Sequence, residues 1–237
     1  SLRRDYLAPY NPKVWFTPEL AAFARESAVF ERAFTHYGGT GLSEPSIWAG
    51  GMMIHKQYVT PFAPMNVLEK LVRGEGYRMR VSRDEILKSI LGPPRAEDRD
   101  LDAGRPTMNL DLCGSLEELA AESGRPGQPF FAYTQPQNVH ISVIQREVAK
   151  AVDGADYAGF HAPYASRVRR LDGCFGGFVK HLKQTGIYDS TIIVFTADHG
   201  DSLGEEGRWG HAYTLFPEIA RIPLIVHVPP ALSAGLT

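Results

Sequence analysis

The sequence is poor in cysteine, with two in 237 residues, Cys113 and Cys174. Two cysteines cannot build a disulfide framework, and neither lies in a Cys-x-x-Cys pair of the kind that binds zinc. A single bridge between them stays open, but two free buried thiols are the simpler interpretation. The sequence also lacks any run approaching the roughly 18 apolar residues that a membrane-spanning helix needs. Its N-terminus shows no signal-peptide pattern.

An excess of charge of one sign is missing as well. Lys and Arg number 25 against 27 Asp and Glu, which leaves a net charge of −2. This balance provides no basic surface for nucleic acid, so we expect no nucleic-acid partner. A content of 43% hydrophobic and 22% charged residues is typical of a globular domain and excludes a disordered or coiled-coil chain. We expect residues 1–237 to form a single domain.

Patterns typical of helices and strands alternate along the chain. Apolar or alternating runs predict strands at residues 77–81, 129–134, 191–196 and 222–228. Helical spacing predicts helices from Pro18 behind a Thr17 N-cap, at 66–73, at 115–123 behind a capping box, and at 168–182. Residues 93–107 lack periodicity and are expected to form a surface loop. The alternation predicts an α/β fold with a mainly parallel central sheet sandwiched by helices.

A polar motif follows the apolar run 191–196 directly. It reads Ala197-Asp198-His199-Gly200-Asp201, and a glycine-framed loop with Arg208 and His211 follows it. Ligands bind beyond the carboxyl ends of strands in such sheets, and a carboxylate with an imidazole suits a divalent cation. The alternative is an Asx-type turn with His199 packed incidentally beside it.

These residues resemble the sulfatase branch of the alkaline phosphatase superfamily. The stretch from Tyr188 to Asp201 is similar to the metal-binding signature of that family. The resemblance covers nearly the whole chain. Its segments are, in the family's order, Phe30–Gly50, Asn66–Tyr77, Pro129–His140, Tyr188–Asp201 and Arg221–Ile225.

The resemblance implies an enzyme that acts on phosphate or sulfate esters. It implies one divalent cation, Ca, Mg, Mn or Zn, bound by Asp198 and His199. It also implies that His140 and His211 contact the substrate, either by holding a phosphoryl oxygen or by protonating the leaving group.

The nucleophile position separates the branches of the family. Family sulfatases convert the Cys of a Cys-x-Pro-x-Arg motif to formylglycine, and here Thr40-Gly41-Leu42-Ser43-Glu44 takes its place. A threonine there resembles the phosphoglycerol and phosphoethanolamine transferases, in which a metal-activated hydroxyl attacks phosphorus. We therefore expect Thr40 to form a covalent intermediate, with Ser43 as the nearest competing hydroxyl. Arg208 is expected to bind substrate in place of the missing motif arginine.

Three alternatives stay open. Thr40 can be read as an ordinary turn residue in a glycine-rich loop. The protein can also be a formylglycine sulfatase in family name only, which the absent Cys opposes. Finally, it can be a degenerate module that binds an anion or a partner without turnover.

The resemblance also implies that the sequence is a fragment. In the family an acidic metal ligand ends the first strand, immediately before a segment similar to Ser1–Leu7, and further elements follow the position of Val228. We expect both to be missing, which would leave a sheet edge open for dimerisation. The expected substrate is a small-molecule or lipid-linked ester, with any membrane attachment outside this segment. The sequence does not predict a compartment.

Overall fold

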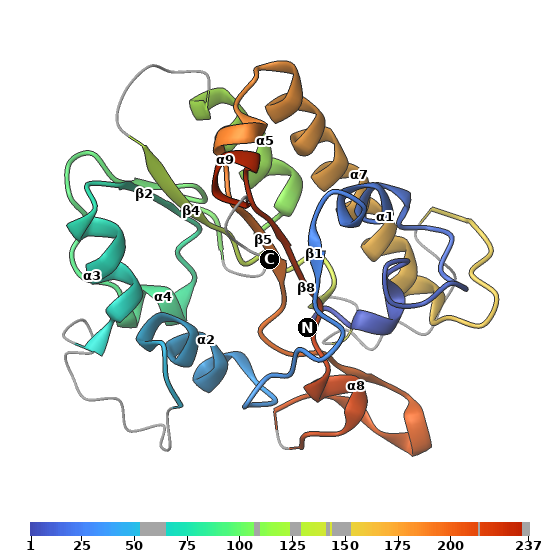
Figure 1. Ribbon diagram of the computed structural model, residues 1–237. Helices are drawn as coiled ribbons and strands as arrows, with labels where there is room; N and C mark the ends of the chain where they lie inside the picture. Colours follow the sequence, from blue (N-terminus) through green and yellow to red (C-terminus); the bar gives the residue numbers. More distant parts are fainter. Residues whose placement is uncertain are drawn as a thin grey trace.

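Strands and helices alternate along the chain in the computed structural model (Figure 1). The structure describes residues 1–52, 65–106, 110–123, 129–140, 143, 153–212 and 214–233. The helices are α1 (Pro18–Ala24), α2 (Thr40–Ala49), α3 (Val67–Gly74), α4 (Glu85–Ile90), α5 (Leu112–Ser123), α7 (Ala162–Gln184), α8 (Pro217–Ala220) and α9 (Pro230–Ser233). Short 3₁₀ turns are η1 (Arg4–Tyr6), η4 (Tyr188–Ser190) and η5 (Glu205–Gly207). The strands are β1 (Ala28–Val29), β2 (Arg78–Val81), β3 (Arg99–Asp100), β4 (Phe130–Tyr133), β5 (Ile193–Thr196), β6 (Ser202–Leu203), β7 (Trp209–Gly210) and β8 (Leu224–His227).

Two three-stranded sheets form the centre of the fold. One has the order β3-β2-β4 and both its pairs are parallel; the other has the order β1-β8-β5 and both its pairs are antiparallel. The predicted α/β class and its parallel sheet are confirmed. The antiparallel pairing of β5 with β8 follows from the connection between them, because residues 197–223 leave and re-enter the sheet at the same end.

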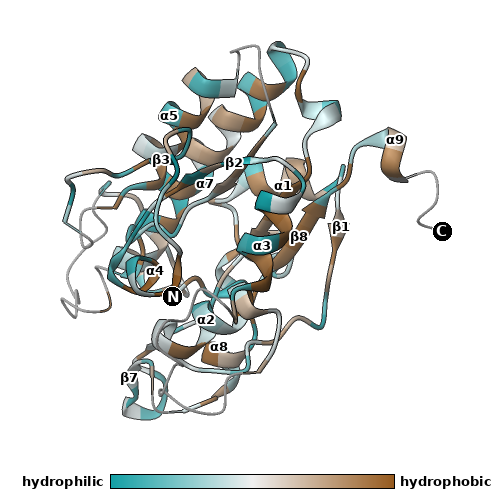
Figure 2. Cartoon of the chain, turned by 90° about the vertical axis from the view of Figure 1, so that its left-hand side faces the viewer, coloured by the Kyte–Doolittle hydropathy of each residue, from teal (hydrophilic) through white to brown (hydrophobic). Residues whose placement is uncertain are grey.

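The long helix α7 organises the larger core. Its predicted apolar stripe is buried, from Val168 through Phe175 to Leu182, and α7 packs against both α1 and α5. Asp172, fully buried in the same stripe, accepts hydrogen bonds from the backbone N–H groups of Glu19 and Leu20 at the start of α1. In Figure 2 the apolar colour is concentrated on the central strands around β8. No helix among the described residues has the length and apolar character to cross a membrane.

A second core lies against β2. Trp48 of α2 is fully buried there with Met79 and Val81 of β2 and with Leu87 and Ile90 of α4. In Figure 1, α2, α3 and α4 gather on this side of the molecule. Asn66 caps α3 by accepting from the backbone N–H of Glu69, so the predicted helix at 66–73 is confirmed. This core holds α2, and with it Thr40, in place.

Three local predictions are wrong. The expected loop 93–107 contains β3. This strand pairs in parallel with β2, with Arg99 opposite Arg80. Helix α5 begins at Leu112, ahead of the expected capping box, because the Asn138 side chain accepts the Leu112 N–H. Strand β5 is not buried on both faces, since Val194 is 56% exposed.

The two cysteines form a disulfide that joins α5 to α7. Cys113 and Cys174 are half-buried, with their Cα atoms 5.1 Å apart, where these two helices pack. The interpretation as free buried thiols is therefore wrong. Helical periodicity shows which face of each helix is apolar, but not that these two faces meet at the cysteines.

Reducing this disulfide should destabilise the fold. A bridge between residues 61 apart restricts the unfolded chain. On loop entropy alone, its loss would lower the free energy of unfolding by about 4 kcal/mol and the melting temperature by on the order of 10 °C. Thermal unfolding with and without reductant measures this, with Cys113→Ser/Cys174→Ser as the matched variant. Equal melting temperatures, or two free thiols in the unreduced protein, would contradict it.

Candidate active site

The predicted site residues come from the ends of separate elements. Asp198 and His199 follow the carboxyl end of β5, His140 follows β4, and Thr40 is the first residue of α2. The N-terminus lies on the side of the molecule that carries α2 and α8 (Figures 1 and 2). These ends meet where ligands bind in open α/β sheets.

Thr40 contacts both residues of the Asp-His pair. Its hydroxyl Oγ1 donates to Asp198 Oδ2 at 2.7 Å and lies 3.1 Å from His199 Nε2. Gly39 precedes it as the N-cap of α2, so Thr40 lies where the positive end of the helix dipole falls. Ser43 Oγ also reaches Asp198 Oδ2, at 3.3 Å, and bonds the carbonyl oxygen of Gly39 at 3.1 Å. Thr40 is therefore the hydroxyl closest to the pair, and Ser43 is the second.

The histidine is held in one tautomer. His199 is fully buried, and its Nδ1 lies 2.7 Å from the carbonyl oxygen of Gly200. A carbonyl can only accept, so Nδ1 carries the proton and Nε2 presents its lone pair toward Thr40 and Asp198. This is the arrangement in which a histidine binds a metal ion, with its other nitrogen donating to a backbone carbonyl.

The other oxygen of Asp198 binds the start of the chain. The amino nitrogen of Ser1 lies 3.1 Å from Asp198 Oδ1, and the Ser1 hydroxyl lies 2.7 Å from His140 Nδ1. Ser1 therefore bridges the residues that follow β4 and β5. The backbone N–H of His199 also donates to Asp198 Oδ1.

The charges fit metal ligands. Burial lowers the pKa of both His140 and His199 below the usual range. Burial opposes ionisation of Asp198, but His199 and the Thr40 hydrogen bond hold its pKa below the usual range. Neutral imidazoles and an ionised carboxylate are the forms that coordinate a cation.

A second histidine cluster adjoins this pair. His211 Nδ1 lies 2.6 Å from Asp201 Oδ1, and the His211 ring is 4.3 Å from the ring of His199 and 5.0 Å from that of His140. Asp201 is fully buried. Ligand atoms of His140, Asp201 and His211 all lie within 4.8 Å of one another. Asp201 belongs to the polar motif after β5, but no role was predicted for it. Its place two residues after His199 is the signal that could have indicated a site residue.

Arg208 is bound elsewhere. Its guanidinium donates to Glu206 and to Glu218 and lies 3.8 Å over the ring of Phe216. The predicted residues that the structure brings together are Thr40, His140, Asp198, His199 and His211.

Glu44 was not predicted as a site residue. It lies one helical turn after Thr40 and is fully buried. Burial, together with the charges of Asp84 and Asp198, raises its pKa well above the usual range, while a hydrogen bond to Tyr133 opposes the shift. This shift disfavours the ionised form of the side chain, which takes the place of the arginine in the sulfatase motif that the sequence resembles.

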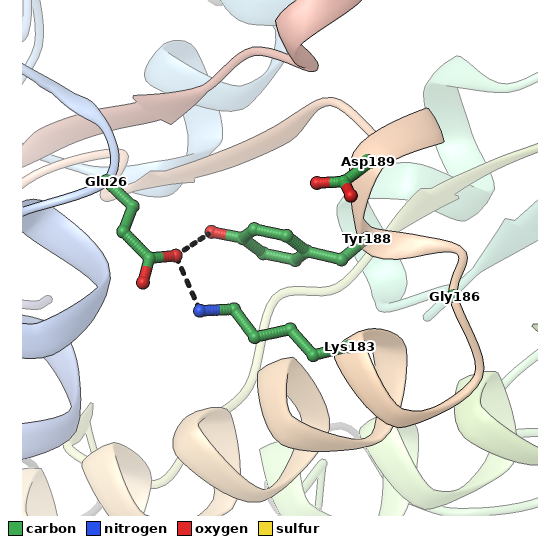
Figure 3. A pocket seen from close by; sticks show the side chains of 5 residues that line it. All are labelled: Glu26, Lys183, Gly186, Tyr188 and Asp189. Atoms are coloured by element: carbon green, nitrogen blue, oxygen red, sulfur yellow. Dashed lines mark hydrogen bonds and ion pairs between the residues drawn. The ribbon is translucent and has the colours of Figure 1, made fainter.

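A pocket elsewhere on the molecule lacks such chemistry. Figure 3 shows Glu26, Lys183, Gly186, Tyr188 and Asp189, which line it. The Glu26 carboxylate accepts from both Lys183 and Tyr188, so these groups satisfy one another. Tyr188 precedes β5, whereas Asp198 and His199 of the candidate site follow it. The pocket therefore lies toward the other end of that strand.

The fold and the cluster define an α/β protein with a hydroxyl nucleophile candidate beside an Asp-His pair. The sequence model of the Sulfatase family matches residues 111–235. The chain therefore belongs to the sulfatase family.

Curated relatives share parts of the sequence. N-acetylglucosamine-6-O-sulfatase of Bacteroides thetaiotaomicron is 36% identical over 88 residues, which are 37% of this chain and 16% of that protein. Human iduronate 2-sulfatase is 32% identical over 112 residues, which are 44% of this chain and 20% of that protein. These matches thus span about a fifth of the relatives' length or less.

Solved structures share the fold over nearly the whole chain. The soluble domain of lipooligosaccharide phosphoethanolamine transferase A from Neisseria meningitidis gives a TM-score of 0.70 at 17% identity, covering 99% of this chain and 75% of that one. Phosphonate monoester hydrolase of Agrobacterium radiobacter gives 0.61 at 14% identity, covering 97% and 66%. These likenesses confirm the alkaline-phosphatase-type fold that the sequence predicted.

Gly200 should be essential to the shape of the site. A Cβ at this position would lie 2.0 Å from the carbonyl oxygen of Glu218, because the turn packs directly on the backbone of α8. We expect Gly200→Ala to destabilise the protein by about 1–3 kcal/mol and to displace His199. Gly177→Ala is the matched control, because a Cβ there meets open space on α7. Denaturant unfolding of both variants measures this, and equal stabilities would contradict it.

Proposed function

We propose that the protein is a metal-dependent hydrolase or transferase of the alkaline phosphatase superfamily that attacks phosphate or sulfate esters through Thr40. The observation that carries the proposal is the 2.7 Å hydrogen bond from the Thr40 hydroxyl to Asp198, with His199 Nε2 at 3.1 Å. An unassisted threonine hydroxyl is a weak nucleophile, so a carboxylate and a cation-binding imidazole beside it support this role.

Asp198 and His199 are the residues that would hold the cation. Asp198 Oδ2 and His199 Nε2 lie 3.3 Å apart and both face the Thr40 hydroxyl, so the donor set fits a divalent ion. A bound cation would lower the pKa of the hydroxyl and offset charge on the transferring group.

The residues of the cluster then divide the work. Thr40 Oγ1, its proton lost to solvent, forms a bond to phosphorus or sulfur, and the bond to the leaving oxygen breaks. His140 and His211 hold the transferring oxygens or protonate the departing alcohol. Water or an acceptor alcohol then releases the group from Thr40. Arg208 is a weaker candidate for substrate binding, because its guanidinium is bound by Glu206 and Glu218.

The threonine favours phosphate over sulfate in this proposal. Formylglycine chemistry has no cysteine to start from at position 40. Several relatives by sequence are named as sulfatases, whereas one structural relative is an integral membrane lipooligosaccharide phosphoethanolamine transferase. We therefore propose a small-molecule or lipid-linked ester as substrate. A degenerate binding module is disfavoured, because Thr40, Asp198 and His199 are joined by hydrogen bonds.

Thr40→Ala should lower turnover by several orders of magnitude, because the hydroxyl itself forms the covalent bond. Thr40→Ser should keep partial activity, and Ser43→Ala should cost far less than Thr40→Ala. The assay uses the complete protein with a phosphodiester, a phosphomonoester and a sulfate ester, and mass spectrometry follows modified Thr40. Wild-type rates in Thr40→Ala with loss in Ser43→Ala would move the nucleophile to Ser43. Wild-type rates in both would end the covalent mechanism.

Asp198→Ala/His199→Ala should abolish tight binding of one divalent cation. His199 is buried and Asp198 is partly buried in the same turn, so their loss removes the carboxylate–imidazole pair at Thr40. Calorimetric titration with Zn²⁺ or Mn²⁺ measures this, with exposed His36→Ala as the control. Unchanged affinity in the double variant would refute the ligand assignment.

A further inference from the structure

We propose that Asn138 is a positioning residue, which places His140 against the residues that follow β5 by binding the loop after β4 to the start of α5. The inference rests on the proposed function, because it takes His140 as a residue that contacts the substrate. Asn138 lies two residues before His140 in the chain and acts through it.

His140 and the Asp-His pair belong to different sheets. His140 follows β4 of the parallel sheet, whereas Asp198 and His199 follow β5 of the antiparallel sheet. Hydrogen bonds within either sheet therefore do not fix the distance from His140 to the pair. Residues 134–140 have to be fixed by contacts of their own.

Asn138 binds the loop to the start of α5 with both ends of its amide. Its Oδ1 accepts from the backbone N–H of Leu112 at 2.9 Å, and its Nδ2 donates to Asp111 Oδ1. The backbone N–H of Gln137 donates to the carbonyl oxygen of Leu110 at 2.8 Å. Asn138 is 7% exposed, so its amide bonds form away from solvent. These contacts fasten the loop just before His140.

A cap for α5 would not require the bond between the two side chains. Asp111 directly precedes the helix, and aspartate commonly caps a helix by accepting N–H groups of the first turn. Here its carboxylate accepts instead from Asn138 and, through Oδ2, from Arg170 of α7 at 2.9 Å. The bond from Asn138 to Asp111 satisfies no helix N–H group. It therefore joins the loop to the helix.

The start of α5 is itself fixed relative to β5. The disulfide joins Cys113 to Cys174 of α7, and α5 packs along α7 (Figure 1). On α7, Phe175 packs edge to face on Phe195 of β5, with ring centroids 5.1 Å apart. Phe195 lies three residues before the Asp-His pair. A continuous set of contacts thus runs from that pair through α7 and α5 to the loop after β4.

A small displacement of His140 would be costly. Its ring stands 5.0 Å from that of His211, which in turn is 4.3 Å from that of His199. A misplacement of about 1 Å among groups that must meet one substrate can cost about 10²-fold in rate. Val139 is also buried in the larger core, but an apolar contact is not directional. The orientation of the loop therefore depends on the amide of Asn138.

The test is a double-variant cycle on the complete protein, with p-nitrophenyl phosphate, its diester and p-nitrophenyl sulfate as substrates. Asn138→Ala should lower kcat per folded molecule about 10–10²-fold, because the loop loses both amide bonds. His140→Ala should lower it about 10²–10³-fold. The double variant should fall no more than about twofold below His140→Ala, since Asn138 acts through His140.

Asp172→Ala is the matched control for lost stability. This buried side chain of α7 likewise accepts backbone N–H groups at the start of another helix, α1. Its kcat per folded molecule should match wild type, because α1 carries no residue of the candidate site. A loss equal to that of Asn138→Ala would show a general effect of stability and overturn the proposal.

A second set of variants reverses the direction of the hydrogen bond. Asn138→Asp keeps an acceptor for the Leu112 N–H but faces Asp111 with like charge, so its kcat should fall. Adding Asp111→Asn supplies a donor again, and Asn138→Asp/Asp111→Asn should recover most of the lost activity. This rescue also tests the proposal where Asn138→Ala does not fold, and its failure would contradict the positioning role.

NMR of histidine-labelled protein follows the His140 ring without substrate, its signal being identified by its absence in His140→Ala. The signal should shift or broaden in Asn138→Ala and keep its wild-type position in Asp172→Ala. An unmoved signal in Asn138→Ala, or losses that multiply in the double-variant cycle, would overturn the positioning role. The proposed function fails separately. Wild-type turnover in His140→Ala, or no turnover of any of the three esters by the wild type, would contradict it, while the NMR signals still decide the role of Asn138.

Discussion

A single partly buried carboxylate, that of Asp198, connects the elements of the candidate site. One oxygen accepts from Thr40 and Ser43 of α2, and the other binds Ser1 and the backbone N–H of His199. The chain start, the first turn of α2 and the end of β5 therefore meet on one anionic group. Removing a charge from water is costly unless it is paired, so each of these elements is held where it can supply a donor.

The charges around Asp198 support the proposal that the site uses a cation. Arg3 is bound to Asp5 and Glu205, and Arg208 to Glu206 and Glu218. Neither guanidinium is directed at Thr40 by these contacts. A phosphate or sulfate ester entering beside Asp198 and Asp201 would meet like charge, unless a metal ion or an imidazolium offset it.

Much of this architecture could be predicted from sequence, because strand ends converge wherever apolar runs alternate with helices. The runs at 129–134 and 191–196 became β4 and β5, and the polar residues after them lie together. Contacts between distant side chains could not be predicted in this way. The Cys113–Cys174 bridge, the Asn138 cap of α5 and the Asp201–His211 pair depend on packing that periodicity does not encode. Arg208 does not join the cluster because its guanidinium binds the carboxylates of Glu206 and Glu218.

Glu44 shows how a reversal of charge in a motif can be tolerated. An ionised carboxylate at this buried position would face Asp84 and Asp198 and repel the substrate as well. Burial and those two neighbours raise its pKa, whereas the hydrogen bond to Tyr133 opposes the shift. The raised pKa limits how much negative charge this carboxyl adds in place of the motif arginine. In the proposed mechanism, stabilising the charge of the transferring group then falls to a cation held by Asp198 and His199 and to the other histidines, which suits a threonine nucleophile that needs a cation for its own activation.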